Sequence, residues 1–419
     1  MKRRKLTLTV ALLLAVLLSL QLAGCAAFAP SVQAADLMEN ITPHRGASTP
    51  VQQADAAAAA DFALRLFRAG NESDKNSLIS PLSVLTALAM TANGAEGETL
   101  AQMEQTLGMD KNRLNRFVRS YLDTLPGDNS LKLANSVWFK DDSRFTVKQN
   151  FLQTNADYYG ADLYKAPFDK GTLKEINGWV ETKTDGRIPE ILNQIPEDAV
   201  MYLANALAFD GKWESPYEHS DVSAGDFTLE NGETRQAEYM KSTEEFYLEN
   251  ETAVGFLKPY KGGKYAFVGL LPKEGLSLKD YVGSLTGAEL QSLLESASPE
   301  SVEVSLLKFK LEYSAELSEV MQAMGMNLAF DPVKADFSGL GSSADGNLAI
   351  SRILHKTFIS VEEEGTKAAA ATVVEMTEGC SIPAEITRHV NLDRPFVYLL
   401  IDTEANLPFL IGTVLDPEA

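Results

Sequence analysis

The chain has 419 residues and a formal net charge of −21 at pH 7. This acidic balance disfavours nucleic acids and anionic lipids as partners, because their phosphates would repel it. Its only cysteines are Cys25 and Cys380. If Cys25 is acylated, as argued next, no intrachain disulfide can form, and the fold must depend on its hydrophobic core.

The first 25 residues have the pattern of an export signal. A basic start precedes an apolar run from Leu6 to Leu20, which is too short for a comfortable membrane span. The run ends in Leu-Ala-Gly-Cys25, the pattern of a bacterial lipoprotein signal. We predict a signal peptide over 1–25, lipid attachment at Cys25, and an exported extracellular or cell-surface protein. The alternative is ordinary cleavage near 32–35, which would release a free secreted protein.

The remainder divides into a linker and one domain. Residues 26–54 are poor in large apolar side chains, so we predict a flexible tether. Residues 55–419 are globular in pattern, with no second linker and no repeat. We therefore predict a single domain.

The first part of that domain is mainly helical in pattern. Apolar residues recur four apart around Phe62 and Phe67, which predicts an amphipathic helix. Ser80 and Pro81 suit a helix start. The apolar run that follows predicts a buried helix ending at Gly94. A shorter helix is expected from Thr99 to a stop at Gly108.

The later part is rich in strand patterns. Val302–Leu306 alternates apolar and polar residues, and other short runs are β-branched or aromatic. Those runs are Ala266–Leu271, Phe358–Val361, Phe396–Ile401 and Phe409–Val414. Helices followed by strands predict a mixed α+β domain.

One connection is unusually long. About 30 residues separate the strand ending near Glu362 from the strand starting near Phe396, and such connections are usually functional. Residues 365–374 are small or β-branched and contain no proline. With a period of two, one face is uncharged: Thr366, Ala368, Ala370, Thr372, Val374 and Met376. The other face carries the charges, so this loop could become a strand.

Motifs for catalysis or cofactors are missing. The four histidines have no metal-ligand spacing, and no nucleophile elbow occurs. Residues 339–344 only weakly imitate a dinucleotide fingerprint, without a convincing strand–turn–helix around them. We predict no enzyme activity, no metal and no cofactor.

The loop segment 363–372 closely resembles the hinge of the serpin reactive-centre loop. Other segments resemble serpin motifs and occur in the family's order: 76–83, 94–99, 135–139, 176–180, 186–188, 205–213, 336–339, 355–356 and 390–396. The resemblance covers about residues 56–417. It implies an α+β serpin fold, with about nine helices packed on three β-sheets and an exposed reactive-centre loop.

The resemblance also implies a function. The chain would be an irreversible suicide-substrate inhibitor of serine or cysteine proteases, acting as a monomer. It would trap the acyl-enzyme by inserting the cleaved loop into the main sheet. The partner would be a protease, with elastase- and subtilisin-like types favoured. The alternative is a non-inhibitory serpin acting as a surface binding protein, but such members tend to have bulky or charged hinges.

The loop positions follow from the same resemblance. The hinge comprises Glu363, Gly365, Thr366, Ala368, Ala369, Ala370, Ala371 and Thr372. Thr366 would be the first inward side chain to enter the sheet. Lys367 departs from the usual acidic residue but faces outward. The reactive bond is placed at Gly379–Cys380, with Glu378–Gly379 and Cys380–Ser381 as alternatives.

Two further sets carry over from the family. A polar cluster beneath the opening point of the sheet would comprise Ser80, Ser83, Asn205 and His355. A set at the top of the sheet would comprise Trp213, Lys308 and Glu363. The simpler interpretation is satisfied core polar groups, a packed tryptophan and a common ion pair. The helix that binds polyanions in some serpins carries Lys111, Arg113, Arg116 and Arg119, although a charged face is usually just solvated.

Overall fold

The computed structural model describes residues 34–47, 49–72, 74–127, 130–142, 145–197, 199–343, 348–366 and 388–418. The predicted lipidation site, the reactive bond and the hinge from Ala368 to Thr372 lie outside these ranges. The globular body and the first hinge residues lie within them.

The described residues form nine α-helices, as predicted. They are α2 (Gln53–Gly70), α3 (Pro81–Ala92), α4 (Gly97–Leu107), α5 (Lys111–Thr124), α6 (Gln149–Tyr159), α7 (Lys170–Lys183), α8 (Leu278–Ser284), α9 (Gly287–Glu295) and α10 (Ser318–Ala323). Short 3-10 turns occur at His219–Asp221 and Leu328–Phe330. No helix in the described ranges is long and apolar enough to cross a membrane.

Helix α3 starts as its sequence predicts but ends differently. Ser80 caps it by accepting from the Ser83 amide, Pro81 occupies the first turn, and every residue is buried. The helix ends at Ala92, so Gly94 is not its cap. A Cβ at Gly94 would strike Leu340, so close packing explains this glycine.

The neighbouring helix α4 starts two residues before the predicted Thr99, at Gly97. It ends as predicted at Gly108, whose φ of 78° is left-handed.

The main sheet has eight strands. Along the sheet they are β1 (Ala35–Asp36), β5 (Asp162–Ala166), β3 (Leu131–Lys140), β6 (Met201–Phe209), β16 (Arg352–Glu362), β17 (Gly365–Thr366) and β7 (Gly211–Lys212), with β14 (Phe309–Glu316) paired to β16. The predicted strand at Phe358–Val361 is part of β16.

The remaining strands form two larger sheets and one small one. The six-stranded sheet comprises β10 (Phe246–Glu249), β11 (Ala253–Pro259), β12 (Tyr265–Pro272), β19 (Phe396–Asp402), β20 (Leu407–Val414) and β2 (Ser77–Ile79). The four-stranded sheet comprises β18 (Arg388–Asn391), β13 (Val302–Leu307), β9 (Thr234–Glu244) and β8 (Val222–Thr228). Strands β15 (Gly341–Ser343) and β4 (Phe145–Val147) pair separately. The predicted α+β class and its later strands are confirmed.

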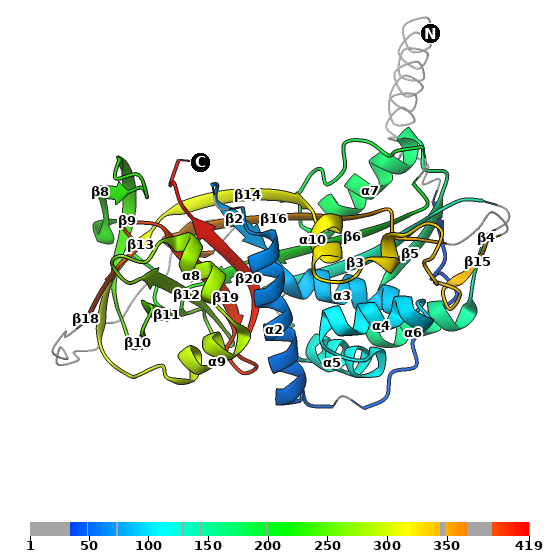
Figure 1. Cartoon of the computed structure of the whole chain (residues 1–419). Coiled ribbons are helices and arrows are strands. Elements are labelled where there is room, and N and C mark those ends of the chain that lie inside the picture. The colour runs from blue at the N-terminus through cyan, green and yellow to red at the C-terminus, as the bar shows by residue number, and fades with distance from the viewer. Residues whose placement is uncertain are drawn as a thin grey trace, which may run out of the picture.

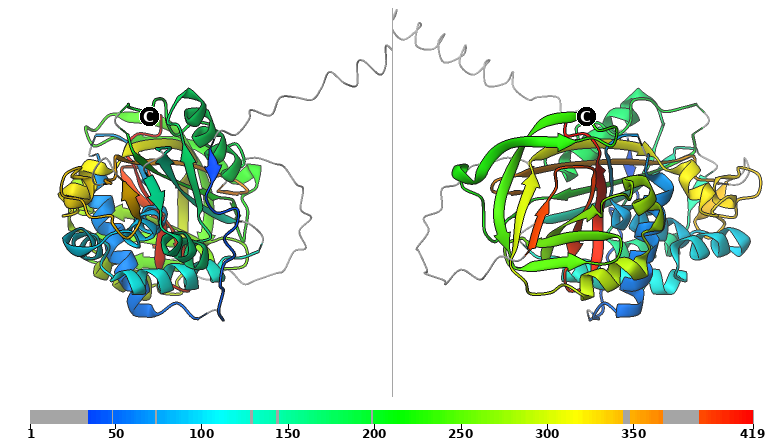
Figure 2. Two further views of the ribbon diagram at one scale, coloured as in Figure 1. Left: turned by 90° about the vertical axis from the view of Figure 1, so that its right-hand side faces the viewer. Right: turned by 60° about the vertical axis from the view of Figure 1, so that its left-hand side comes forward.

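The main sheet is covered on both faces. In Figure 1, α7 lies on one side of it and α3 to α6 lie on the other. Ile176 and Val180 of α7 pack against Tyr202 and Ala204 of β6. Figure 2 shows the other two large sheets gathered at the end of the molecule away from α4 to α6. The main sheet therefore connects a helical end to a β-rich end.

The N-terminal segment packs on the body. Ala35 of β1 pairs with Lys165 at the edge of the main sheet. The Ala34 amide donates to Glu175 of α7 at 3.0 Å, and the His44 amide donates to Asp157 of α6 at 2.6 Å. The predicted flexible tether therefore does not hold for residues 34–47. An open sheet edge binds backbone of almost any composition, so polar and small residues suffice.

Gly412 tests the packing of the six-stranded sheet. A Cβ there would strike the Ser77 carbonyl and the Tyr398 ring, so Gly412→Ala should destabilise the protein by about 1–3 kcal/mol through overpacking. Gly178→Ala is the control, because nothing lies within 4 Å of a Cβ at that helical position. We expect the control to stabilise by about 0.5–1 kcal/mol. Urea midpoints measure both, and equal midpoints would contradict the packing argument.

Candidate functional site: a gap in the main sheet and its hinge

The main sheet is incomplete between β6 and β16. Strand β6 pairs with β3 along its whole length. On its other side it pairs with β16 only from Tyr202–Arg352 to Asn205–His355. Beyond that point, no strand in the described ranges pairs with residues 206–209 of β6 or with the facing edge of β16 at 356–360. Two open strand edges therefore face each other inside a sheet.

The far end of this gap is closed by the start of the loop. Gly365 and Thr366 form β17, which pairs with Val361 on one side and with β7 on the other. Thr366 is 2% exposed, and its hydroxyl bonds to the Tyr260 hydroxyl. We predicted that Thr366 would be the first inward side chain to enter the sheet. It already lies within the sheet in the resting structure.

Glycine is required at position 365. A Cβ there would strike the Gly211 carbonyl and lie 2.8 Å from the Lys212 Cα. The backbone of β17 can therefore approach β7 only because residue 365 has no side chain.

A short segment from Trp213 to Tyr217 holds the residues just before β17. The Trp213 amide donates to the Glu364 carbonyl at 3.0 Å, and the Tyr217 amide donates to the Glu363 carbonyl at 2.9 Å. The Trp213 indole donates to the Glu362 carbonyl at 2.9 Å and stacks on Tyr260 at 4.5 Å. We call residues 213–217 the hinge clamp.

An ion pair adds to this contact. Lys308 lies 2.9 Å from the carboxylate of Glu363 and 3.4 Å from that of Glu238. Burial raises the pKa of Glu363, but the hydrogen bond and charge of Lys308, together with a backbone hydrogen bond, outweigh burial and leave that pKa below its usual value. In turn, the hydrogen bond to Glu363 raises the pKa of Lys308. The structure thus brings together Trp213, Lys308 and Glu363, as the sequence resemblance implied.

The predicted polar cluster lies where β6 and β16 meet. The Ser80 amide donates to His355 Nε2 at 3.0 Å, and the Ser83 hydroxyl donates to Asn205 Oδ1 at 2.9 Å. All four residues, Ser80, Ser83, Asn205 and His355, are at most 1% exposed. The start of α3 is therefore bonded to both strands at the end of the gap where β6 and β16 pair directly with each other.

Two donors in this cluster have no acceptor. Because His355 Nε2 accepts, Nδ1 carries the proton of the neutral ring. Within the described ranges, neither His355 Nδ1 nor Asn205 Nδ2 has a hydrogen-bond partner. Leaving a buried donor unpaired costs about 1–3 kcal/mol. Burial also lowers the pKa of His355 from 6.5 to about 4, so the ring is neutral at pH 7.

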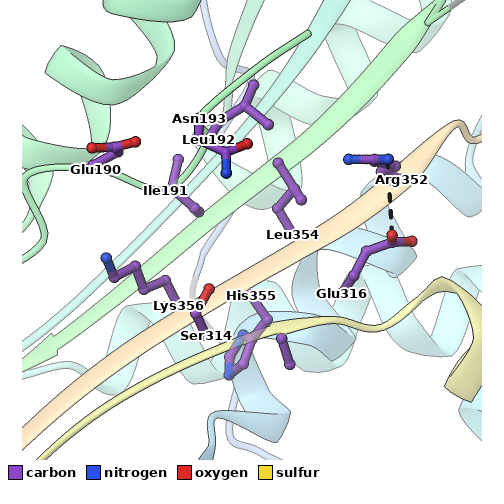
Figure 3. Close-up of a pocket in the computed structure, with 11 residues that line it drawn as sticks. Glu190, Ile191, Leu192, Asn193, Ser314, Glu316, Arg352, Leu354, His355 and Lys356 are labelled. Carbon is purple, nitrogen blue, oxygen red and sulfur yellow. Dashed lines mark ion pairs between the residues drawn. The ribbon is translucent and has the colours of Figure 1, made fainter. Parts of the chain in front are cut away.

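A cavity of about 300 Å³ lies on the outer face of the sheet beside this cluster. Figure 3 shows Ile191 and Leu192, from the segment after α7, opposite Leu354 and Lys356 of β16. Ile191 and Leu192 belong to the same apolar cluster as Leu354. This segment therefore covers the strands that a longer insertion would have to separate.

Sequence reasoning missed several residues here. Tyr260 and Tyr217 are essential to the contacts above, yet neither occurs in a pattern that indicates a site. The basic residues on α5 are mostly neutralised: Arg113 pairs with Asp55 at 2.6 Å and Arg119 with Asp123 at 2.8 Å. Lys111 is 3.7 Å from Glu96. This pairing gives little support to polyanion binding.

Comparison with known proteins accounts for this architecture. The family model described as serpin (serine protease inhibitor) matches residues 57–417. The chain belongs to the serpin family. Members of this family are, in general, protease inhibitors rather than enzymes.

Several relatives are similar over nearly their whole length. Leukocyte elastase inhibitor A of Mus musculus is 33% identical, over 85% of this chain and 97% of that protein. The leukocyte elastase inhibitor of Equus caballus is 34% identical, over 83% of this chain and 96% of that protein. Among solved structures, the native state of the thermophilic serpin tengpin is 46% identical with a TM-score of 0.87, covering 92% of this chain and 100% of that one. Its latent state gives 0.78 at 44% identity, covering 88% and 100%.

His355 predicts a pH dependence of stability. Its pKa is about 4 when folded and 6.5 when unfolded, so unfolding takes up a proton between these values. The contribution of His355 to the free energy of unfolding should be fully present above pH 6.5 and should fall by up to about 3 kcal/mol as the pH drops to 4. His355→Gln should remove this part of the decline, whereas the exposed His389→Gln should retain it. Denaturant midpoints at pH 7 and 4.5 measure the difference; equal declines in all three proteins would refute the assignment.

Proposed function

We propose that this serpin is an irreversible suicide-substrate inhibitor of serine or cysteine proteases. A target protease attacks the loop near Gly379–Cys380 and forms an acyl-enzyme. The freed loop then inserts between β6 and β16 and carries the protease with it. Small residues around the bond favour an elastase- or subtilisin-like target, and the leukocyte elastase inhibitors among the relatives support the same choice.

The register of β17 is the observation that carries this proposal. Thr366 pairs with Val361 of β16 and with Gly211 of β7. Six residues further along, the same antiparallel register brings Thr372 opposite His355 on one side and Asn205 on the other. His355 and Asn205 are themselves the last paired residues of β16 and β6. Residues 367–371 therefore have the length of the open gap, and Thr372 reaches the first pair that closes it.

The alternation of inward and outward side chains in the hinge agrees with this register. Thr366 points into the core opposite the buried Val361. Continuing the alternation turns Ala368, Ala370 and Thr372 inward and Lys367 outward. Thr372 would then place a hydroxyl beside the unpaired donors of His355 and Asn205.

The energetic drive comes from bonds absent in the resting state. The five inserted residues 367–371 would pair with both neighbouring strands at about 1 kcal/mol net per hydrogen bond, which adds up to several kcal/mol. Insertion of Thr372 and the residues after it must separate the four pairs that join β6 to β16, beginning with His355–Asn205, and displace the segment around Ile191. A strand of about 14 residues spans roughly 45 Å, so the protease would be carried along the length of the main sheet.

A covalent complex is the direct test. Incubation with an elastase- or subtilisin-type protease should give a complex that survives SDS and migrates near the sum of the two masses. If all tested proteases cut the loop and remain active, the inhibitory function is excluded. That result would favour the alternative, a non-inhibitory serpin that acts as a surface binding protein.

Ala368→Arg tests the insertion step in the same assay. The substitution would bury an unpaired charge opposite Ile359, which raises the insertion barrier without affecting acylation. An increase of about 3 kcal/mol slows insertion on the order of a hundredfold, so hydrolysis wins and the variant becomes a substrate. Lys367→Glu, facing outward, is the control and should behave like the parent. The measurement is the number of inhibitor molecules consumed per protease inactivated, and parental efficiency in Ala368→Arg would exclude insertion with this face.

We further propose that the chain is exported and anchored by lipid at Cys25. The support is the sequence pattern of a basic start, an apolar run and Leu-Ala-Gly-Cys. A membrane association would then depend on the lipid alone.

The anchor predicts a change in location. Cys25→Ala should move the protein from the membrane fraction to the medium, because the thioether can form only on that sulfur. Intact-mass analysis of the parent should show an acylated N-terminal cysteine. An unmodified start downstream of residue 25 would contradict the proposal.

A further inference from the structure

Lys258 is a buried cation outside the hinge contacts described so far. Its side chain, on β11, is only 2% exposed. The ammonium lies 2.7 Å from Glu244, which is itself buried at the end of β9. Enclosing two charges so completely is costly unless the cation has further partners.

Those further partners all belong to the hinge clamp. The ammonium donates to the Ser215 carbonyl at 3.2 Å. It lies 4.3 Å from the centre of the Tyr217 ring and 5.4 Å from that of Trp213. A desolvated cation over aromatic faces is a favourable contact. One ammonium thus touches the beginning, middle and end of the clamp.

Glu244 extends the same network. Its carboxylate accepts from the Ser242 hydroxyl at 2.6 Å, and that hydroxyl lies 3.1 Å from the Tyr217 hydroxyl. Residues of β9 and β11 therefore bond to the clamp on one side. On its other side, the amides of the clamp donate to the carbonyls of Glu363 and Glu364.

We propose that Lys258 is a positioning residue for the hinge. Its ammonium fixes the clamp, and the clamp holds residues 362–364 so that the loop enters the sheet from a fixed point. The importance of this for protease trapping rests on the proposed function, whereas the mechanical link does not. The competing explanation is that Lys258 only neutralises the buried charge of Glu244.

Hydrogen exchange separates the two explanations without any protease. In Lys258→Met, Glu244→Gln both charges are removed, so no unpaired charge remains. If Lys258 positions the clamp, amides in residues 211–217 should exchange about tenfold faster or more, as expected for the loss of a charged hydrogen bond. Peptide 131–140 of β3 should keep its parental rate. The matched control is Lys264→Met, Asp402→Asn, because this pair lies at 3.0 Å in the six-stranded sheet without touching the clamp.

The outcomes are distinct. Faster exchange confined to 211–217 supports the proposal. Parental exchange there, or equal acceleration in 131–140, overturns it, because the pair would then serve only charge balance or general stability. Should the double variant not fold, Tyr217→Leu removes the ring beneath the ammonium and keeps the ion pair. It should also speed exchange in 211–217, and parental exchange would overturn the proposal.

A second measurement connects the clamp to inhibition. Pre-incubated at a fixed temperature, the double variant should lose inhibitory capacity several-fold faster than the parent and the Lys264 control. Should no protease be inhibited by any of the three, the proposed function fails while the exchange result still stands. Should the variant retain parental inhibition despite faster exchange, Lys258 would still position the clamp, but the proposed control of loop entry by the clamp would be overturned.

Discussion

The short pairing between β6 and β16 is the constraint on which the rest of the structure depends. Four residue pairs join two strands that could have paired along much more of their length. Backbone groups in the interior of a sheet normally bond to a neighbour. Among the residues that the structure describes, a stretch of β6 and β16 has no such neighbour, although an otherwise complete core surrounds it. Under the proposed insertion, the apolar core supports a local structure that is less stable than its alternative.

Side chains reinforce the backbone pairing at the two ends of this gap. At one end, Ser80 and Ser83 at the start of α3 reach across to His355 and Asn205. At the other, the Tyr260 hydroxyl bonds to the Thr366 hydroxyl, and the Tyr260 ring stacks on Trp213. Such contacts break and re-form more readily than a ladder of backbone bonds. The higher similarity to the native than to the latent state of tengpin is consistent with an uninserted resting form.

The sequence predicted this site unevenly, for physical reasons. The hinge face could be predicted because alternation of small residues is visible in one dimension. How far the hinge had entered could not, because that depends on Gly365 approaching Gly211 closely. Ser80 was predictable as a helix cap, whereas the packing of Gly94 on Leu340 was not. Lys258 and Glu244 read as ordinary surface charges until the folding of β9 beside β11 encloses them. The N-terminal segment was missed because a sheet edge recruits backbone without a side-chain signal.

The place of β1 sets the direction in which a tethered molecule would work. β1 pairs with the end of β5 near Lys140 and Met201, whereas β17 lies at the opposite end of the same sheet. Eight residues lie between Cys25 and Ala34, and the nine steps from one to the other reach about 30 Å at most. A lipid at Cys25 would hold the β1 end of the main sheet close to the bilayer. The β17 end, where the reactive-centre loop begins, would then face away from the membrane. A captured protease, drawn the length of the sheet, would finish at the membrane side. The space between the anchored protein and the bilayer would then limit the size of the protease that can be fully immobilised.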